Sequence, residues 1–201
     1  MPDPLGRALP APTARGTWRQ WRDDRARRRF LQRSFAYAAT PPPPEQWAKF
    51  GRAYVVPPAR VNRPDLIWLG DGVVILEDVW MSVVPAFDGI VPRLVLGDRV
   101  HVGRGCQFSV ADEVVIEDDV LIGDFTQIGD TSHPYDARIR AKALYPPQRV
   151  RIGRRAVICS HVTILPGVTV GAGAVVDHHT VVTRDVPTGA VVRGNPARVV
   201  P

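Results

Sequence analysis

The sequence predicts an all-β protein built as a parallel β-helix, in which short strands wind around one continuous core. Two observations support this prediction. Aliphatic residues recur at every sixth position over most of residues 69–182, and a glycine often follows them. An α-helix would repeat about every 3.6 residues and a simple strand about every two, so neither explains a period of six. In a β-helix, each six-residue segment supplies one short strand and one corner.

The anchors, aliphatic except for Phe108, form four runs with the same six-residue step. They are Leu69, Ile75 and Met81; Leu96, Val102 and Phe108; Ile116, Ile122 and Ile128; and Ile152, Ile158, Ile164, Val170, Val176 and Val182. The backbones of successive coils pair about 4.8 Å apart, which leaves little room for large side chains inside. We therefore expect the anchors to stack into one core of aliphatic residues.

Three interruptions break the repeat, at residues 82–95, 109–115 and 130–150. Insertions in a solenoid become loops, and loops on a rigid body tend to carry functional sites. The third interruption is the longest, and it abandons the six-residue pattern completely. We expect the chemistry of the protein to lie in this loop.

Residues 1–47 form a basic, proline-rich extension that precedes the β-helix domain of residues 48–201. The first 40 residues hold nine arginines and three aspartates, a net charge of +6, which equals the formal charge of the whole chain. The β-helix itself is therefore neutral and carries no basic footprint for nucleic acid.

A short helix is expected within this extension, from Thr17 to Ala39, because aromatic residues recur there at roughly helical spacing. The prolines that begin at Pro41 would end it. Its aromatic and arginine side chains allow two interpretations. The helix makes peripheral contact with an anionic membrane, or it packs on the body or on a neighbouring subunit.

Cys106 and Cys159 are the only cysteines, too few for a disulfide framework and without the spacing of a zinc site. We expect both to be small buried residues. No stretch approaches the roughly 18 consecutive apolar residues of a membrane span, and the N-terminus lacks the apolar segment of a secretory signal. The expected location is the cytoplasm.

Five segments in a fixed order carry a resemblance to a known family. They are Phe50–Pro64, Ser132-His133-Pro134, Ser160–Gly167, Val181–Pro187 and Gly194–Arg198. Over about residues 48–201 the chain resembles the hexapeptide-repeat acyltransferases, particularly sugar O-acetyltransferases similar to maltose, galactoside and polysaccharide acetyltransferases. The resemblance implies a left-handed coil, a homotrimer and active sites between subunits. It implies transfer of an acyl group from acetyl-CoA, or another acyl-CoA, to a hydroxyl of a sugar, glycan or natural product, with no metal.

His133 matches the family's general base, which takes a proton from the acceptor hydroxyl as that oxygen attacks the acyl thioester. Imidazole suits this role because it can accept a proton near neutral pH. Asp136 either orients the imidazole or makes a turn, and both interpretations remain open.

Five residues match positions that contact the acyl donor in this family. Backbone groups near Ser160 and His178 would bind the amides of the pantetheine arm. Thr183 and Arg184 match a Thr-Lys pair near the nucleotide, and Arg198 matches a C-terminal arginine. Arginine suits these positions because its guanidinium pairs with the phosphates of coenzyme A. Surface charge exposed to solvent is the alternative for both arginines.

The sequence departs from the family pattern beside the proposed donor groove. Val157-Ile-Cys-Ser160 replaces the usual Trp-Ile-Gly-Ser, and Asp177-His178-His179 replaces Gly-Ala-Gly. A second function therefore stays open, a non-catalytic trimeric scaffold that has lost donor binding.

A third candidate is a zinc-dependent hydratase, because carbonic anhydrases with the same coil bind zinc through three histidines between subunits. The sequence does not favour it. His161 has no companion histidine five residues on, and His178 and His179 point to different sides of an extended chain. His101 and His161 are expected at turn or outward positions with structural roles.

Overall fold

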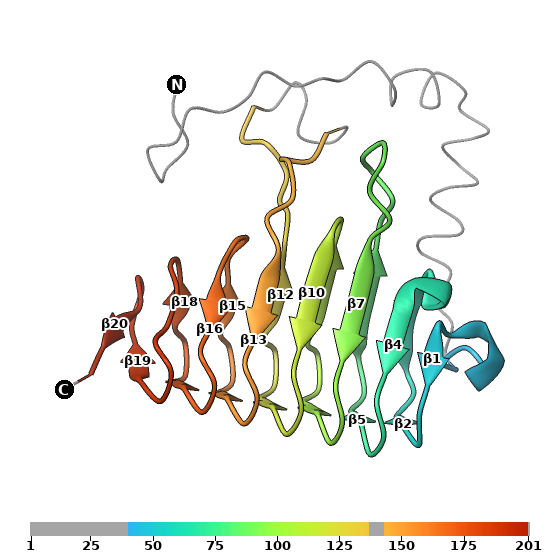
Figure 1. Cartoon of the computed structure of the whole chain (residues 1–201), viewed down its shortest axis with the longest axis horizontal. Coiled ribbons are helices and arrows are strands. Elements are labelled where there is room, and N and C mark those ends of the chain that lie inside the picture. The colour runs from blue at the N-terminus through green and yellow to red at the C-terminus, as the bar shows by residue number, and fades with distance from the viewer. Residues whose placement is uncertain (1–39, 137–142, 201) are drawn as a thin grey trace.

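Three sheets, parallel except for the last strand of one of them, form the sides of the β-helix, and the strands up to β19 pass from one sheet to the next in turn (Figure 1). This computed structural model describes residues 40–136 and 143–200. Sheet A contains β1 (Lys49–Phe50), β4 (Ile67–Leu69), β7 (Arg93–Leu96), β10 (Glu113–Ile116), β13 (Val150–Ile152) and β16 (Thr169–Val170). Sheet B contains β2 (Tyr54–Val55), β5 (Val74–Ile75), β8 (His101–Val102), β11 (Leu121–Ile122), β14 (Val157–Ile158), β17 (Val175–Val176), β19 (Val191–Arg193) and β20 (Arg198–Val199). Sheet C contains β3 (Ala59–Asn62), β6 (Val79–Val83), β9 (Gln107–Val110), β12 (Gln127–Gly129), β15 (Thr163–Ile164) and β18 (Val181–Val182).

The six-residue anchors stack as the sequence predicts. Ile152 pairs with Val170 in sheet A, and Ile158 pairs with Val176 in sheet B. Every anchor is at most 2% exposed. Each three-strand coil thus places three anchors in the core, directly above those of the coil before. The predicted parallel β-helix is confirmed.

The corners between sheets B and C hold residues in a left-handed backbone conformation. Phe125, His161 and His179 have φ angles of 57°, 61° and 57°, and Gly105 occupies the same corner one coil earlier with φ 64°. Such angles are uncommon for residues other than glycine. The three ring-bearing residues are exposed, so this corner presents their side chains to solvent.

All three interruptions of the repeat lie at one edge of the body. Residues 84–92 join β6 to β7, residues 111–112 join β9 to β10, and residues 130–149 join β12 to β13. Each connection therefore runs from sheet C to sheet A. Figure 1 shows the first and third of these loops rising along the same edge of the β-helix. The coil thus gathers its irregular segments on one side.

The two ends of the β-helix are closed differently. At the first coil, a 3-10 helix η1 (Pro44–Gln46) precedes Trp47, whose buried ring packs edge-on against Phe50. A second 3-10 helix, η2 (Pro64–Leu66), leads into β4. At the last coil, β20 turns back and pairs antiparallel with β19.

The helix expected from Thr17 to Ala39 lies outside the described residues, as do the aromatic and arginine side chains considered for membrane contact. In the described part of the chain, neither helix has the length or the apolar character needed to cross a bilayer.

Candidate active site

His133 lies on the loop between β12 and β13, where a backbone carbonyl holds its ring. Its Nδ1 is 3.0 Å from the carbonyl oxygen of Ala143. A carbonyl oxygen can only accept a hydrogen bond, so Nδ1 carries a proton in this contact, and in the neutral ring Nε2 has the lone pair. The side chain is exposed. The free nitrogen is therefore a base that a bound molecule can approach.

The base of this loop is fixed by a buried carboxylate. Asp130 accepts hydrogen bonds from the backbone N–H groups of Ala111, at 2.8 Å, and Asp112, at 2.7 Å. Its own carbonyl accepts the N–H of Gln148 at 2.7 Å, which joins the two ends of the loop. Burial raises the pKa of Asp130, although the hydrogen bonds from the Ala111 and Asp112 N–H groups oppose the shift. The position of His133 thus depends on the hydrogen bonds that the buried Asp130 carboxylate accepts from the backbone of the preceding coil.

The two sides of the loop are also bonded to each other close to His133. The N–H of Tyr145 donates to the carbonyl of Ser132 at 2.8 Å, and the hydroxyl of Thr131 donates to the carbonyl of Tyr145 at 2.6 Å. Pro134 is buried. Asp136 is half-buried in the same loop, but the hydrogen bond of His133 Nδ1 goes to the backbone of Ala143. The orienting contact through Nδ1 is therefore one that the sequence analysis missed.

Ser160 and His178 occupy equivalent corners of successive coils, between sheets B and C. The N–H of Ser160 donates to Nδ1 of His178 at 3.2 Å, and the N–H of His178 donates to Oδ1 of Asp177 at 2.8 Å. The N–H of Arg104, at the same corner of an earlier coil, donates in the same way to Asp124 at 3.0 Å. Side chains of this chain therefore already bond the N–H groups of the two residues near which backbone groups were expected to bind the acyl donor.

The structure separates the other predicted donor residues from this corner. Thr183 and Arg184 follow β18, at the corner between sheets C and A where the His133 loop also leaves the body. Thr183 is half-buried and Arg184 is exposed. Arg198 begins β20 and donates to the carbonyl of Ala197 at 2.8 Å. A molecule that contacts both Ser160 and Arg184 must lie across the outer face of sheet C.

Cys106 is buried as expected, but the expectation for Cys159 was wrong, because its side chain is only half-buried. Ile158 points into the core, so the next residue in the chain turns outward at the corner. Burial raises the pKa of Cys159, and the nearby Asp177 carboxylate raises it further.

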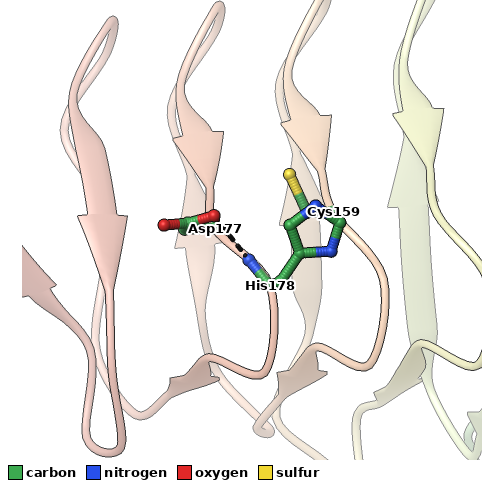
Figure 2. Close-up of side chains that lie close together, drawn as sticks. All are labelled: Cys159, Asp177 and His178. Atoms are coloured by element: carbon green, nitrogen blue, oxygen red, sulfur yellow. Dashed lines mark hydrogen bonds between the residues drawn. The ribbon is translucent and has the colours of Figure 1, made fainter.

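The thiol of Cys159 belongs to a cluster that crosses two coils. One ligand atom each from Cys159, Asp177 and His178 lie within 4.8 Å of one another. Figure 2 shows the thiol above the imidazole ring, with the carboxylate beside them. The separation of 18 residues between Cys159 and Asp177 equals one regular coil, and this signal in the sequence was missed.

The exposed histidines at the B–C corner form a stack. The ring of His161 lies 5.2 Å from Phe125 and 4.7 Å from His179, nearly parallel to both. His101 is half-buried in β8. The outward or turn positions expected for His101 and His161 are confirmed.

The chain is similar in sequence and structure to a hexapeptide-repeat-containing acetyltransferase from Vibrio cholerae, whose crystal structure was determined in complex with acetyl-coenzyme A. The two share 30% identity with a TM-score of 0.54, over 89% of this chain and 77% of the other. This chain belongs to the hexapeptide-repeat acyltransferases. Its coil is the left-handed β-helix of that family.

Other known proteins are similar to this chain in sequence or in fold. A Staphylococcus aureus protein, provisionally named an acetyltransferase, is 38% identical over 105 residues, which are 52% of this chain and 53% of that protein. The chain spans about half the length of the curated relatives it matches first. AntD, an N-acyltransferase from Bacillus cereus, has a TM-score of 0.68 at 16% identity, over 78% of this chain and 83% of AntD, which shows the shared fold alone. No family model matches the chain.

Proposed function

We propose that this protein is an O-acyltransferase that moves an acetyl or other acyl group from acyl-CoA to a hydroxyl of a sugar, glycan or natural product. The observation that carries the proposal is the contact between His133 Nδ1 and the carbonyl of Ala143. It directs Nδ1–H to the backbone, so that in the neutral ring Nε2 carries the lone pair that a general base requires. The Vibrio cholerae relative, solved with acetyl-coenzyme A, supports the choice of donor.

His133 would act twice in this reaction. Nε2 takes the proton from the acceptor hydroxyl as its oxygen attacks the thioester carbonyl. The tetrahedral intermediate then collapses, the carbon–sulfur bond breaks, and the imidazolium returns the proton to the departing thiolate of coenzyme A. The Ala143 carbonyl stabilises the imidazolium, because it accepts the Nδ1–H in both protonation states.

The donor would lie across the outer face of sheet C. Its pantetheine arm would use backbone groups near Ser160 and His178, and its phosphates would pair with Arg184 and Arg198, which are both exposed. Thr183 lies beside Arg184 and can donate a hydroxyl hydrogen bond to the same end. For the arm to bind, the side chains of His178 and Asp177 must release the N–H groups that they now occupy.

We further propose that the active unit is a homotrimer in the cytoplasm, with the His133 loop of one chain facing the donor groove of its neighbour. The separation of His133 from the Ser160 corner within one chain supports this arrangement. The B–C corner and the edge that carries the loop lie on opposite borders of sheet C.

The decisive experiment is a panel of acyl-CoA donors against pooled sugar and secondary-metabolite acceptors, followed by mass shift of the acceptor. Amine-bearing sugars belong in the panel, because AntD is an N-acyltransferase. Transfer to a hydroxyl that the His133→Ala variant has lost supports the proposal. Transfer only to amines would change the proposed class of acceptor. The absence of any product would contradict the proposal that the protein is an acyltransferase.

A second candidate is a non-catalytic trimeric scaffold. The observation that favours it is that the N–H groups of Ser160 and His178, the residues near which the donor was expected to bind, are bonded to side chains of the same chain. If the protein is a scaffold, coenzyme A should not raise its melting temperature. If it is an acyltransferase, the melting temperature should rise with the concentration of coenzyme A.

A further inference from the structure

The cluster of Cys159, Asp177 and His178 brings a sulfur, an oxygen and a nitrogen ligand together outside the His133 loop. All three residues stand where the sequence departs from the pattern of its family, in two segments one coil apart. Their side chains converge to within 4.8 Å (Figure 2). We propose that these three side chains bind one divalent transition-metal ion of the zinc class.

The types of ligand select the class of metal. Zinc takes thiolate, imidazole and carboxylate ligands together, whereas magnesium and calcium take oxygen ligands. Three protein ligands leave the fourth tetrahedral position to water or to another molecule. His178 is exposed and the other two residues are half-buried, so an ion reaches the site from solvent and the fourth position faces outward.

The geometry needs only a local contraction. Zinc bonds of about 2.0–2.3 Å place tetrahedral ligand atoms roughly 3.3–3.8 Å apart. The present upper limit of 4.8 Å therefore requires shifts of about 1 Å, within the reach of side-chain rotations at a corner. Cys159 and Asp177 are two acidic side chains in close approach, so their ionised forms repel each other. A bound cation removes this repulsion.

Three existing contacts compete with the ion. The N–H of Ser160 donates to Nδ1 of His178, and the N–H of His178 donates to Asp177. Arg193 also faces Asp177, with Nε 3.6 Å from Oδ2. The arginine pair is exposed and therefore weak. Binding through the imidazole breaks the Ser160 bond, because a neutral ring has only one lone pair to give.

This inference does not depend on acyl transfer, and its test uses no acyl donor. The full-length protein, reduced and stripped of metal by a chelator, is titrated with zinc chloride in a calorimeter. We expect one zinc ion per chain, with micromolar or tighter affinity that falls as pH is lowered, because binding displaces the thiol proton. Cobalt(II) should give a thiolate-to-metal charge-transfer band. Magnesium and calcium should give no binding.

Variants with matched controls assign the site. Cys159→Ser and His178→Ala should each weaken zinc binding at least tenfold, and Cys159→Ser should abolish the cobalt charge-transfer band. His179→Ala and Cys106→Ala remove the neighbouring histidine and the other thiol of the chain, and both should bind zinc as the wild type does. Circular dichroism of each variant verifies the fold.

The proposal is overturned if the wild type binds no zinc or if Cys159→Ser binds zinc unchanged. It is also overturned if only His179→Ala loses zinc binding, which would place the ion at the stacked pair of His161 and His179.

Discussion

The backbone N–H of Ser160 donates a hydrogen bond to Nδ1 of His178, 3.2 Å away on the next coil. Backbone groups near each residue were expected to bind an acyl donor, and in the structure the ring of His178 occupies the N–H of Ser160. The same bond completes the corner of the coil, as Asp124 does for Arg104. The contact therefore connects the stability of the corner to the affinity of the proposed groove.

Replacing His178 with alanine should lower the KM for acyl-CoA by about two- to tenfold. The Ser160 N–H no longer has to leave an internal partner, and a typical hydrogen bond contributes about 0.5–1.5 kcal/mol net. Steady-state kinetics with a chelator present measure the change without interference from metal ions. His179→Ala, which alters an adjacent exposed ring, should leave the KM unchanged. A higher KM for His178→Ala would show that the imidazole itself holds the donor.

His133→Ala should reduce turnover by about 10²–10⁴, the usual contribution of a positioned general base. Acyl-CoA affinity should change little, because the proposed donor residues lie on other segments of the chain. Product formation under saturating donor, together with calorimetric binding of coenzyme A, separates the two effects. His101→Ala, at an outward position in β8, serves as the control. Retention of more than about a tenth of the wild-type rate would remove His133 from the mechanism.

Arg184→Ala should raise the KM for acyl-CoA severalfold and leave kcat nearly unchanged, because a phosphate contact far from the reacting atoms binds ground state and transition state alike. The difference should shrink at high salt, which screens exposed charges. Arg52→Ala provides a comparison, since Arg52 is also exposed but lies on the first coil. Equal effects of the two variants would mean that Arg184 contributes only general surface charge.

The protein should elute as a homotrimer, and static light scattering should give three times the chain mass of 22.1 kDa. The prediction follows from the proposed placement of His133 and the donor groove on neighbouring chains. A monomer that nevertheless transfers acyl groups would require both parts of the site to meet within one chain.

Alkaline pH should destabilise the protein through Cys106. Burial raises the pKa of this thiol to about 11, and its Sγ lies 3.1 Å from the carbonyl of Gly123. In the unfolded chain the thiol ionises near pH 8.5. Between these two values the unfolded state loses the proton first, so the free energy of unfolding falls as pH rises, by up to about 3 kcal/mol.

Urea unfolding of wild type and Cys106→Ala across pH 8 to pH 11 tests this linkage. The variant should start less stable, because alanine leaves a small cavity, but should lose less stability as pH rises. Cys159→Ala should change the pH dependence of the unfolding free energy less than Cys106→Ala does, since the Cys159 thiol is only half-buried. If the unfolding free energies of wild type and Cys106→Ala fell in parallel as pH rises, Cys106 would not be the cause of the alkaline destabilisation.

The repeat itself determined the fold in advance. Anchors such as Ile152, Ile158 and Ile164 repeat every sixth residue, and only a coil with three short strands per turn buries them all. The same period marked the 130–150 loop as irregular and so directed attention to His133. These features follow from local chemistry, because burial and turn formation depend on each residue and its near neighbours.

The tertiary structure alone decided which side chains meet. The sequence alone does not predict that the three interruptions lie at one edge. Nor does it predict that the carbonyl of Ala143 accepts a hydrogen bond from the His133 ring, or that the N–H of Ser160 donates to the His178 ring. The spacing of Cys159, Asp177 and His178 suits no zinc motif in an ordinary chain, and its match to one coil has meaning only once the β-helix is known. Stacking of coils makes residues about 18 positions apart into neighbours, and rotamers at the corners then select the contacts that form.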